Sequence, residues 1–450
     1  MSGKKGYLKT SSKKAKPWLL LAVGLPTTAM MSATLGAIVA FSLSSTPLLQ
    51  SKLSDSPTET LTPSSTIATS NLQLPQLTRP VNILVLGTKV LTTDLKTNPE
   101  PNLNYQALVN SFEGLSDTML LVRFDPVSRK VTILSIPRDT QTEIEGKGTV
   151  KINEANAVGG AALAVKTVSN LLGGVQIDRY IRVNVQSIEK FIDAIGGVNM
   201  YVPKDMKYND FSQHFYVDLK AGQQHLDGEK VVQFLRFRHD EYGDIGRIQR
   251  QQLLMRAVTE QVLNPQILMK IPTILNVIKE NIDSNLTLEE LLALSGTVYQ
   301  TQRSQVQMLL LPGNFNDNGR RSISYWLPDT EKIQNLMARY FELGETDLAS
   351  EDTTNIKIAL QNGTDDPNAP RQVMESLQKA GYSRISIGNP TSEPLAVTRV
   401  IAQTGDERGA NLLQSGLGIG EVFVESTGNL NSDVTIQIGR DWQAKPLNTP

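Results

Sequence analysis

The chain has 450 residues, 40% of them hydrophobic, which is enough for two ordinary domains with connecting segments. Its formal net charge of −1 excludes a global basic field for nonspecific nucleic-acid binding. The sequence has no cysteine, which excludes disulfides, thiol catalysis and cysteine-ligated metals, and its three histidines lack metal-ligand spacing.

The N-terminal region combines a basic segment with an apolar one. Residues 1–17 contain six lysines and no acid, and residues 18–43 are apolar and long enough to cross a bilayer as a transmembrane helix. The positive-inside rule then keeps residues 1–17 in the cytoplasm. We therefore expect a single-pass protein of the cell membrane whose main domains are extracytoplasmic, with a cleaved signal peptide as the alternative.

The segment that follows, residues 44–79, is rich in Ser, Thr and Pro and poor in large apolar side chains. This composition is typical of an extended linker. We expect it to hold the next domain away from the membrane.

Short apolar runs predict the first strands of a globular domain. The run VNILVLGT (81–88) has the form of a buried central strand, and residues 118–124 and 130–136 flank a turn that begins at Asp125. These last two runs therefore predict a pair of antiparallel strands.

Polar residues stand at neighbouring ends of this predicted pair. Ser116 and Asp117 precede the first strand, and Arg138 and Asp139 follow the second. In an antiparallel pair these ends lie side by side, so two carboxylates and an arginine are expected to meet there. Aspartates at strand ends also cap turns, which is the alternative for either aspartate alone.

Helical patterns then alternate with strands. Residues 161–174 end in glycines, and residues 187–197 place apolar side chains at helical spacing before the apolar run 198–202. This alternation predicts an α/β fold, a three-layer αβα sandwich with a central mixed sheet.

Two further predicted helices carry a group of side chains suited to an anion. The group comprises Arg236 and Arg238 at the end of helix 226–235, and Arg247, Arg250 and Gln251 on one face near the start of helix 244–263. A helix N-terminus together with forked guanidinium donors can bind phosphate oxygens. The alternative is a solvated set of ion pairs with nearby acids. The neighbouring Phe234 and Phe237 favour the anion site, because semi-buried arginines need anionic partners.

The remaining chain predicts the end of this domain and a second, smaller one. Residues 264–300 predict two helices, the second opened by a capping box at 287–290, and residues 305–313 predict a closing strand. The acidic segment 341–353 reads as a linker. Residues 354–442 contain alternating strand and helix patterns of a small α/β domain.

At this point the sequence resembles the LytR-CpsA-Psr family. Five separated blocks occur in that family's order and spacing: SDTMLLVRFDPVSRKVTILSIPRDT, KINEANAVGG, YIRVNVQSIEKFIDAIGGVNMYVP, LKAGQQHLDGEKVVQFLRFRH and GDIGRIQRQQ. The resemblance implies a catalytic domain over residues 80–335. Residues 354–442 are similar to the LytR C-terminal domain that often follows.

The resemblance implies a phosphotransferase that takes a glycan polymer from a polyprenyl-pyrophosphate carrier and joins it to a peptidoglycan hydroxyl. It assigns Mg²⁺ to Asp117 and Asp139, directly or through water. Catalytic roles fall on Arg138, Asp139, Arg236 and Arg238, and substrate binding falls on Lys151, Arg247, Arg250 and Gln251. A polyprenyl tail also requires an apolar cavity; the Leu, Ile and Val residues of 161–195 are candidates to line one, although ordinary core is the favoured interpretation for any single residue among them.

One position departs from the family. Leu115 stands where the family commonly has arginine, which removes one expected phosphate donor. A second reading is therefore a non-catalytic envelope module that binds polyprenyl phosphate or an anionic polymer. A third is a transcriptional attenuator, but the expected topology keeps the basic face away from nucleic acid.

Overall fold

The structure, a computed structural model, describes residues 67–68, 75–89, 112–210, 215–237, 243–316, 324–344, 356–391 and 393–444. The predicted membrane span, 18–43, and the basic segment before it lie outside these ranges. Within the described ranges no helix is long and apolar enough to cross a bilayer.

A central mixed sheet organises the first domain. Its strands lie in the order β13 (Asp283–Ser284), β8 (Arg179–Val183), β3 (Val81–Lys89), β4 (Leu115–Asp125), β5 (Lys130–Ile136) and β14 (Val306–Leu310). The predicted hairpin is confirmed, because β4 and β5 pair antiparallel, while β3–β8 and β5–β14 pair parallel. β4 begins earlier than predicted, since Leu115 and Ser116 still pair with the end of β3.

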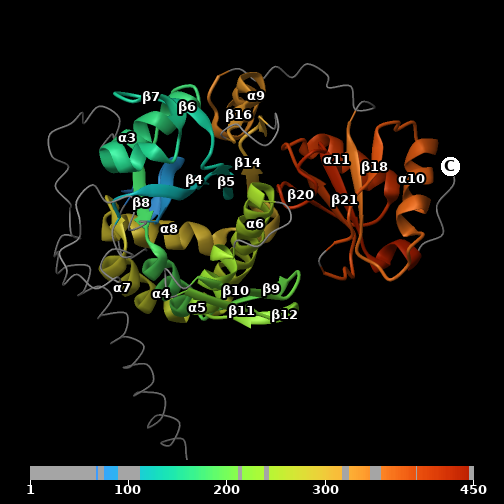
Figure 1. Ribbon diagram of the computed structural model, residues 1–450, viewed down its shortest axis with the longest axis horizontal. Coiled ribbons are helices and arrows are strands. Elements are labelled where there is room, and N and C mark those ends of the chain that lie inside the picture. Colours follow the sequence, from blue (N-terminus) through green and yellow to red (C-terminus); the bar gives the residue numbers. More distant parts are fainter. Residues whose placement is uncertain are drawn as a thin grey trace, which may run out of the picture. The chain divides into compact units, whose positions relative to one another are not determined.

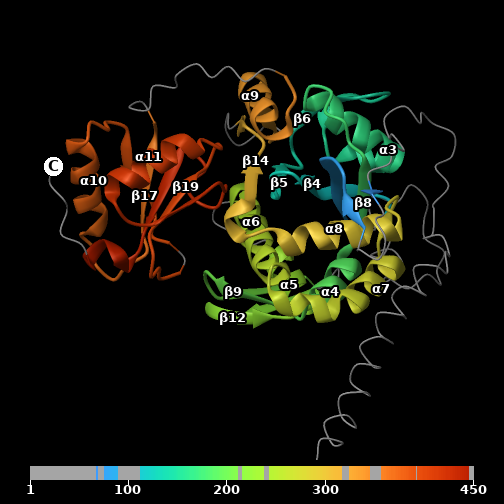
Figure 2. The same ribbon diagram turned by 180° about the vertical axis from the view of Figure 1, so that it is seen from behind.

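Helices cover both faces of this sheet, as the layered prediction requires (Figures 1 and 2). The helices on one face are α3 (Glu154–Leu171) and α9 (Thr330–Phe341). The helices on the other face are α4 (Val185–Ile195), α5 (Gly228–Arg236), α6 (Gly243–Val262), α7 (Ile271–Asn281) with the short η3 (Pro265–Lys270), and α8 (Leu288–Gln300). The predicted capping box is present, because Thr287 and Glu290 exchange their hydrogen bonds at the start of α8.

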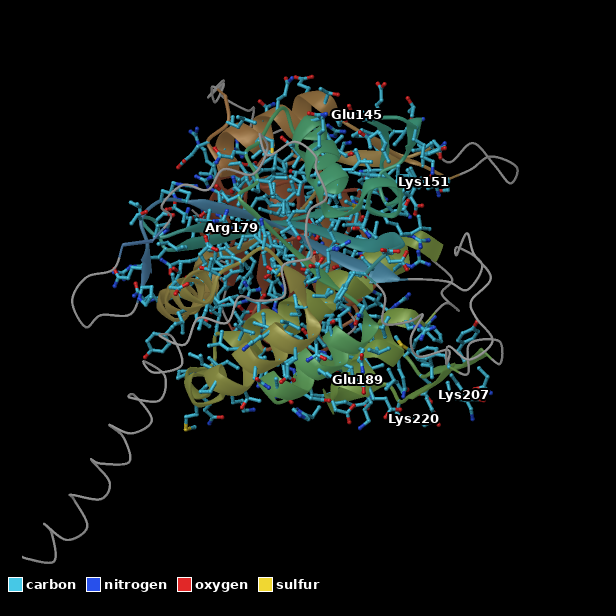
Figure 3. All side chains as sticks on the ribbon, turned by 90° about the vertical axis from the view of Figure 1, so that its left-hand side faces the viewer. Glu145, Lys151, Arg179, Glu189, Lys207 and Lys220 are labelled. Carbon is cyan, nitrogen blue, oxygen red and sulfur yellow. The ribbon has the colours of Figure 1, made fainter. Side chains whose placement is uncertain are left out.

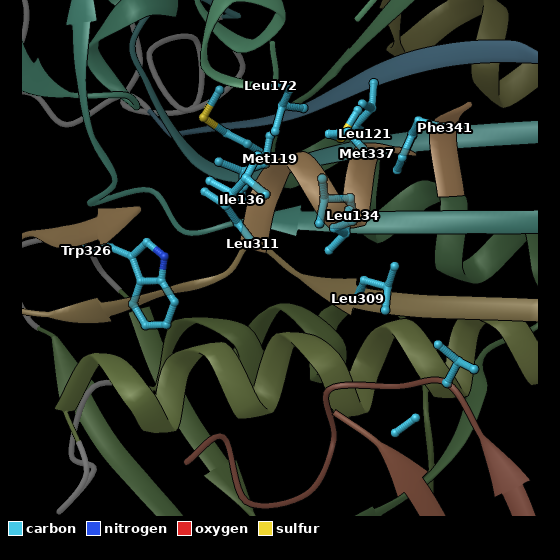
Figure 4. Packing of buried hydrophobic residues seen from close by; sticks show 14 of the residues in the cluster. Met119, Leu121, Leu134, Ile136, Leu172, Leu309, Leu311, Trp326, Met337 and Phe341 are labelled. Atoms are coloured by element: carbon cyan, nitrogen blue, oxygen red, sulfur yellow. The ribbon is translucent and has the colours of Figure 1, made fainter. Parts of the chain in front are cut away.

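The two faces of the sheet differ in how tightly they are closed. Leu121 and Leu134 are fully buried against the α3 and α9 side (Figure 4). On the opposite face, Val85, Val122 and Ile181 remain partly exposed although they lie in central strands. An apolar surface in the middle of a sheet that keeps solvent access is unusual for a close-packed core.

Side chains of α3 belong to the closed face. Ala164, Val165 and Val168 are fully buried beneath the sheet. Ordinary core, the favoured interpretation for single residues of 161–195, is therefore confirmed for these three side chains.

A satellite layer of small sheets surrounds α4, α5 and α6. Its strands are β9 (Val198–Val202) paired with β12 (Gly222–Leu226), and β10 (Met206–Asp210) paired with β11 (Phe215–Leu219). The run 198–202 was expected among the alternating layers, but it does not join the central sheet. Its apolar side chains instead pack with Phe234 and Leu254 in a separate core cluster.

Three small elements complete the domain near the hairpin. They are the pair β6 (Gln141–Ile144) and β7 (Gly148–Lys151), the pair β15 (Gly313–Phe315) and β16 (Trp326–Pro328), and the turn η4 (Arg303–Gln305).

The predicted domain boundaries shift by a few residues. β2 (Gln76–Leu77) pairs with β1 (Ile67–Ala68), and Leu77 is buried in the cluster that includes residues of α8. The linker predicted over 44–79 therefore ends earlier. At the other end Phe341 is buried as the last residue of α9, so the domain extends beyond 335 and the linker begins after it.

The tail domain, residues 356–444, has its own mixed sheet in the order β18-β17-β21-β19-β20. Its elements along the chain are β17 (Ile358–Asn362), α10 (Ala369–Lys379), β18 (Ile385–Ile387), β19 (Arg399–Ala402), α11 (Glu407–Leu417), β20 (Glu421–Phe423), β21 (Val434–Ile438) and η6 (Arg440–Ala444). The small α/β domain predicted for this region is therefore present.

Candidate functional site

The neighbouring ends of β4 and β5 bring the expected charges together. Arg138 Nη1 donates to Asp117 Oδ1 at 2.8 Å, and Arg138 Nε lies 3.3 Å from Asp139 Oδ2. One guanidinium thus lies between two carboxylates, which confirms the convergence that the hairpin geometry predicts. Asp139 is only 5% exposed, so its charge needs these partners.

A β-bulge places Asp117. Gly87 pairs with Thr118, and the next residue, Thr88, pairs with Ser116, so Asp117 is the extra residue of β4. A bulge leaves one residue outside the ladder and redirects its side chain, and bulges are common beside active sites. Ser116 and Asp117, expected just before the strand, therefore lie within it.

A lysine from the β6–β7 hairpin completes the charge cluster. Lys151 Nζ donates to Asp139 Oδ1 at 2.5 Å and lies 5.7 Å from the ring centroid of Tyr325. The main chain of Asp139 is fixed as well, because Trp326 N donates to its carbonyl oxygen at 2.9 Å. Figure 3 shows Lys151 in the upper part of the view, near Glu145, and Glu189 in the lower part.

Arg236 is the last residue of α5, whose N-cap is Asp227 as predicted. Its guanidinium carbon lies 3.8 Å from the ring centroid of Phe215, the first residue of β11. This stacking orients the planar cation, whose N–H donors point outward in the plane of the guanidinium. Arg238 lies outside the described residues.

Arg250 occupies the inside of the junction between α5 and α6. It is 5% exposed, and its Nη2 donates to the carbonyl oxygen of Phe237 at 2.8 Å. Burial lowers the pKa of Arg250 to about 10, so the group is still charged at neutral pH. The Arg250 side chain therefore holds the main chain of Phe237, the residue that follows Arg236, and does not extend into solvent.

Gln251 reaches the bulge from α6. Its Nε2 donates to Thr118 Oγ1 at 3.1 Å and lies 3.3 Å from the carbonyl oxygen of Asp117. The partly exposed Arg247 lies one helical turn earlier on the same face. Arg250 therefore connects α6 to the residue that follows α5, and Gln251 connects α6 to the main chain of the bulge.

Asp117 and Asp139 supply two carboxylates, the side chains through which proteins commonly bind Mg²⁺. Among the described residues no group of three or more acidic or histidine side chains forms a protein-only metal site. Mg²⁺ commonly binds through one or two carboxylates and keeps waters and substrate phosphates as its other ligands. Asp117 and Asp139, which converge on one guanidinium, fit that pattern.

Three residues at the site were not singled out from the sequence. Phe215 stacks on Arg236, Tyr325 lies beside Lys151, and Asn156 binds the main chain before β4. Each acts on a residue far away in the chain, so no local spacing or periodicity could have identified it.

Comparison of the sequence with known proteins identifies a family for each of the two domains. The LytR_cpsA_psr family matches residues 44–342, and the family described as LytR cell envelope-related transcriptional attenuator matches residues 355–442. A relative from Bacillus mycoides (strain KBAB4), named polyisoprenyl-teichoic acid–peptidoglycan teichoic acid transferase TagU, is 33% identical over 235 residues, which are 51% of this chain and 75% of the relative.

Two further proteins are also similar to this chain. TagU of Bacillus anthracis is 33% identical over 222 residues, which are 49% of this chain and 71% of that protein. The crystal structure of Bacillus subtilis TagV is 26% identical and matches with a TM-score of 0.49 over 59% of this chain and 99% of that one. With its family match over most of the sequence, the chain belongs to the LytR-CpsA-Psr family.

Proposed function

We propose that this protein is a membrane-anchored phosphotransferase that moves a glycan polymer from a polyprenyl-pyrophosphate carrier to peptidoglycan. The observation that carries the proposal is the convergence of Asp117, Arg138, Asp139 and Lys151 at the end of the β4–β5 hairpin. The names of the TagU relatives, which describe transfer of a polyisoprenyl-linked teichoic acid to peptidoglycan, support the substrate classes.

The proposed reaction exchanges one phosphorus–oxygen bond for another. An acceptor hydroxyl of peptidoglycan attacks the phosphorus that bears the glycan, and a new phosphodiester forms. The bond between that phosphorus and the bridging oxygen breaks, so polyprenyl monophosphate leaves and the hydroxyl proton is released. The step requires charge neutralisation on the phosphate oxygens more than covalent help from the protein.

The chain's cations are suited to hold the diphosphate. Arg138 lies between the carboxylates, and Arg236, stacked on Phe215, can direct its N–H donors to phosphate oxygens. Arg238 and Arg247 are proposed to contact the same group. Mg²⁺, held by Asp117 and Asp139, would neutralise additional phosphate charge. Arg250 and Gln251 are proposed to support these contacts from within the fold.

The polyprenyl chain is proposed to lie on the less closed face of the central sheet. Val85, Val122 and Ile181 provide a partly exposed apolar surface there. Thr118 and Gly87 pair on the same strands nearer the bulge. An apolar tail on this surface would therefore lead toward the charged end of the hairpin, with its diphosphate beside Asp117.

Anchoring is proposed to come from the apolar segment 18–43, with residues 1–17 in the cytoplasm and the domains outside. A reporter enzyme fused after Ser70 tests this orientation. Activity of a reporter that functions only outside the cytoplasm supports the proposal, and activity of one that functions only inside contradicts it.

The proposed activity is tested with the full chain in detergent, a polyprenyl-pyrophosphate-linked glycan, peptidoglycan and Mg²⁺. We expect release of polyprenyl monophosphate and glycan covalently attached to peptidoglycan. Arg236→Ala and Arg238→Ala should abolish transfer while the protein stays folded, and Asp117→Ala should remove both activity and Mg²⁺ dependence. Substrate binding without release of polyprenyl monophosphate would instead indicate a non-catalytic module.

A further inference from the structure

The main chain that leads into β4 is held by a side chain of α3. Asn156, which is 3% exposed, donates from Nδ2 to the carbonyl oxygens of Phe112 at 3.0 Å and of Gly114 at 2.8 Å. Only the amide nitrogen of a carboxamide can donate to two carbonyls, so these contacts fix its orientation. Asn156 therefore clamps the three residues that end just before Leu115.

A side chain of α6 holds the same strand from the other end of the bulge. Asp117 has no partner in the β3–β4 register, and Gln251 Nε2 donates to the Asp117 carbonyl oxygen and to Thr118 Oγ1. Two carboxamides from different helices thus flank a stretch whose own ladder is interrupted. Neither of them contacts the Asp117 carboxylate in the described contacts.

The position of Asp117 depends on this stretch of main chain. An unpaired bulge residue has less support from neighbouring strands than a residue within a regular ladder. Displacing a reacting group by about 1 Å can lower a rate by roughly 100-fold. Contacts that fix the bulge can therefore affect the reaction without touching the substrate.

We propose that Asn156 and Gln251 are positioning residues that hold the β4 bulge and so orient the Asp117 carboxylate for phosphoryl transfer. The inference rests on the proposed phosphotransferase function. It gives Gln251 a role that differs from the grip on the diphosphate implied by family resemblance. It also gives Asn156 a role in the reaction, although the contacts of Asn156 are with main chain before β4.

The chain provides a matched control for each residue. Asn82 is 7% exposed, and like Asn156 it donates from Nδ2 to a backbone carbonyl while its Oδ1 is buried without a partner in the described structure. It lies at the opposite end of β3, six residues before Thr88 and so roughly 20 Å along the strand. Gln252, next to Gln251, donates to Ser135 Oγ at 2.8 Å instead of to the bulge.

The test compares full-length Asn156→Leu, Gln251→Ala and their double variant with Asn82→Leu and Gln252→Ala. We expect kcat to fall by roughly 10- to 100-fold in the two positioning variants. KM for the lipid-linked substrate should stay within about threefold, because the arginine contacts remain. Because both residues act through one carboxylate, the double variant should lose less than the product of the single losses.

A second measurement does not depend on activity. Hydrogen exchange of the amides of residues 115–119, measured without substrate, should be faster in the positioning variants than in the controls. Each positioning variant should have the same midpoint of thermal unfolding as its control. A difference in exchange at equal midpoints then reflects positioning of the bulge and not a general loss of stability.

Two results would overturn the inference. One is a kcat for glycan transfer that is the same in each positioning variant as in its control. The other is a Gln251→Ala variant that raises KM alone, which would indicate a direct grip on the diphosphate. If the unaltered protein transfers no glycan while exchange at 115–119 still responds as expected, the proposed function fails and the clamp on the bulge stands as a structural feature only.

Discussion

The Nζ atom of Lys151 lies 2.5 Å from Oδ1 of Asp139, a carboxylate that is almost wholly buried. Arg138 approaches the other oxygen of the same carboxylate. A buried charge is tolerated only when partners compensate for the loss of hydration. The lysine of the β6–β7 hairpin therefore compensates, together with Arg138, for the hydration that the Asp139 carboxylate loses on burial.

Replacement of this lysine should destabilise the fold measurably. Lys151→Met leaves Asp139 with Arg138 as its remaining cation, so we expect the free energy of unfolding to fall by about 1–3 kcal/mol. Urea denaturation measures the change. Lys147→Met is the control, because Lys147 pairs with Glu154 at a more exposed position, where an ion pair contributes about 0–1 kcal/mol. Equal losses in the two variants would contradict the role assigned to Lys151.

The stacking of Arg236 on Phe215 leads to a prediction about substrate affinity. In Phe215→Leu the guanidinium loses its aromatic platform, which contributes on the order of 1 kcal/mol. We expect the dissociation constant for polyprenyl pyrophosphate to rise about fivefold, measured by calorimetry with the intact protein. Tyr216→Leu, at the exposed neighbouring position, is the control and should bind normally. Unchanged affinity in Phe215→Leu would mean that the ring does not orient Arg236 for the ligand.

Features with local signals could be predicted from the sequence. The β4–β5 hairpin followed from two apolar runs around a turn, and the helix after Asp227 followed from its N-cap. The meeting of Asp117 with Arg138 then followed from the antiparallel geometry alone. In each of these the residues that determine the structure are near one another in the chain.

Features that depend on distant partners could not be predicted in this way. The bulge at Asp117 appears only in the register between β3 and β4. Gln251 meets that bulge across 134 positions of sequence, and no periodicity within α6 indicates it. The run 198–202 looked like a strand of the main sheet, because apolar alternation does not specify which strand will be its partner.

A buried ion pair connects β8 of the central sheet to α8. Arg179 donates from Nε at 3.0 Å and from Nη2 at 2.6 Å to the two oxygens of Glu290. Arg179→Met should lower the free energy of unfolding by about 3–5 kcal/mol, because it leaves a buried carboxylate without its cation. Adding Glu290→Met should recover part of that loss, although Glu290 also caps Thr287. A double variant no more stable than Arg179→Met would argue against a penalty from the uncompensated carboxylate.

Close packing of α4 on α5 brings acidic side chains together around Glu189, so the stability of the protein should depend on pH there. A side chain at Gly228 would place its Cβ 2.2 Å from the carbonyl oxygen of Glu189, so glycine is required for the helices to approach this closely. Partial burial raises the pKa of Glu189, and the nearby Asp193, Glu229 and Asp227 raise it further.

The sign of the effect follows from the raised pKa of Glu189. Folding disfavours its ionised form, so the charge destabilises the protein above the folded-state pKa, and that cost disappears as the pH falls through it toward 4.5. Glu189→Gln should therefore raise stability at pH 7 by no more than about 0.5 kcal/mol, since water screens the cluster, with no gain below about pH 4.5. Lys190→Gln should have the opposite sign at pH 7, because Lys190 lowers the pKa of Glu189. Thermal unfolding from pH 4 to 8 measures both variants, and a Glu189→Gln gain that persists unchanged at pH 4 would show that the gain does not come from relieved charge.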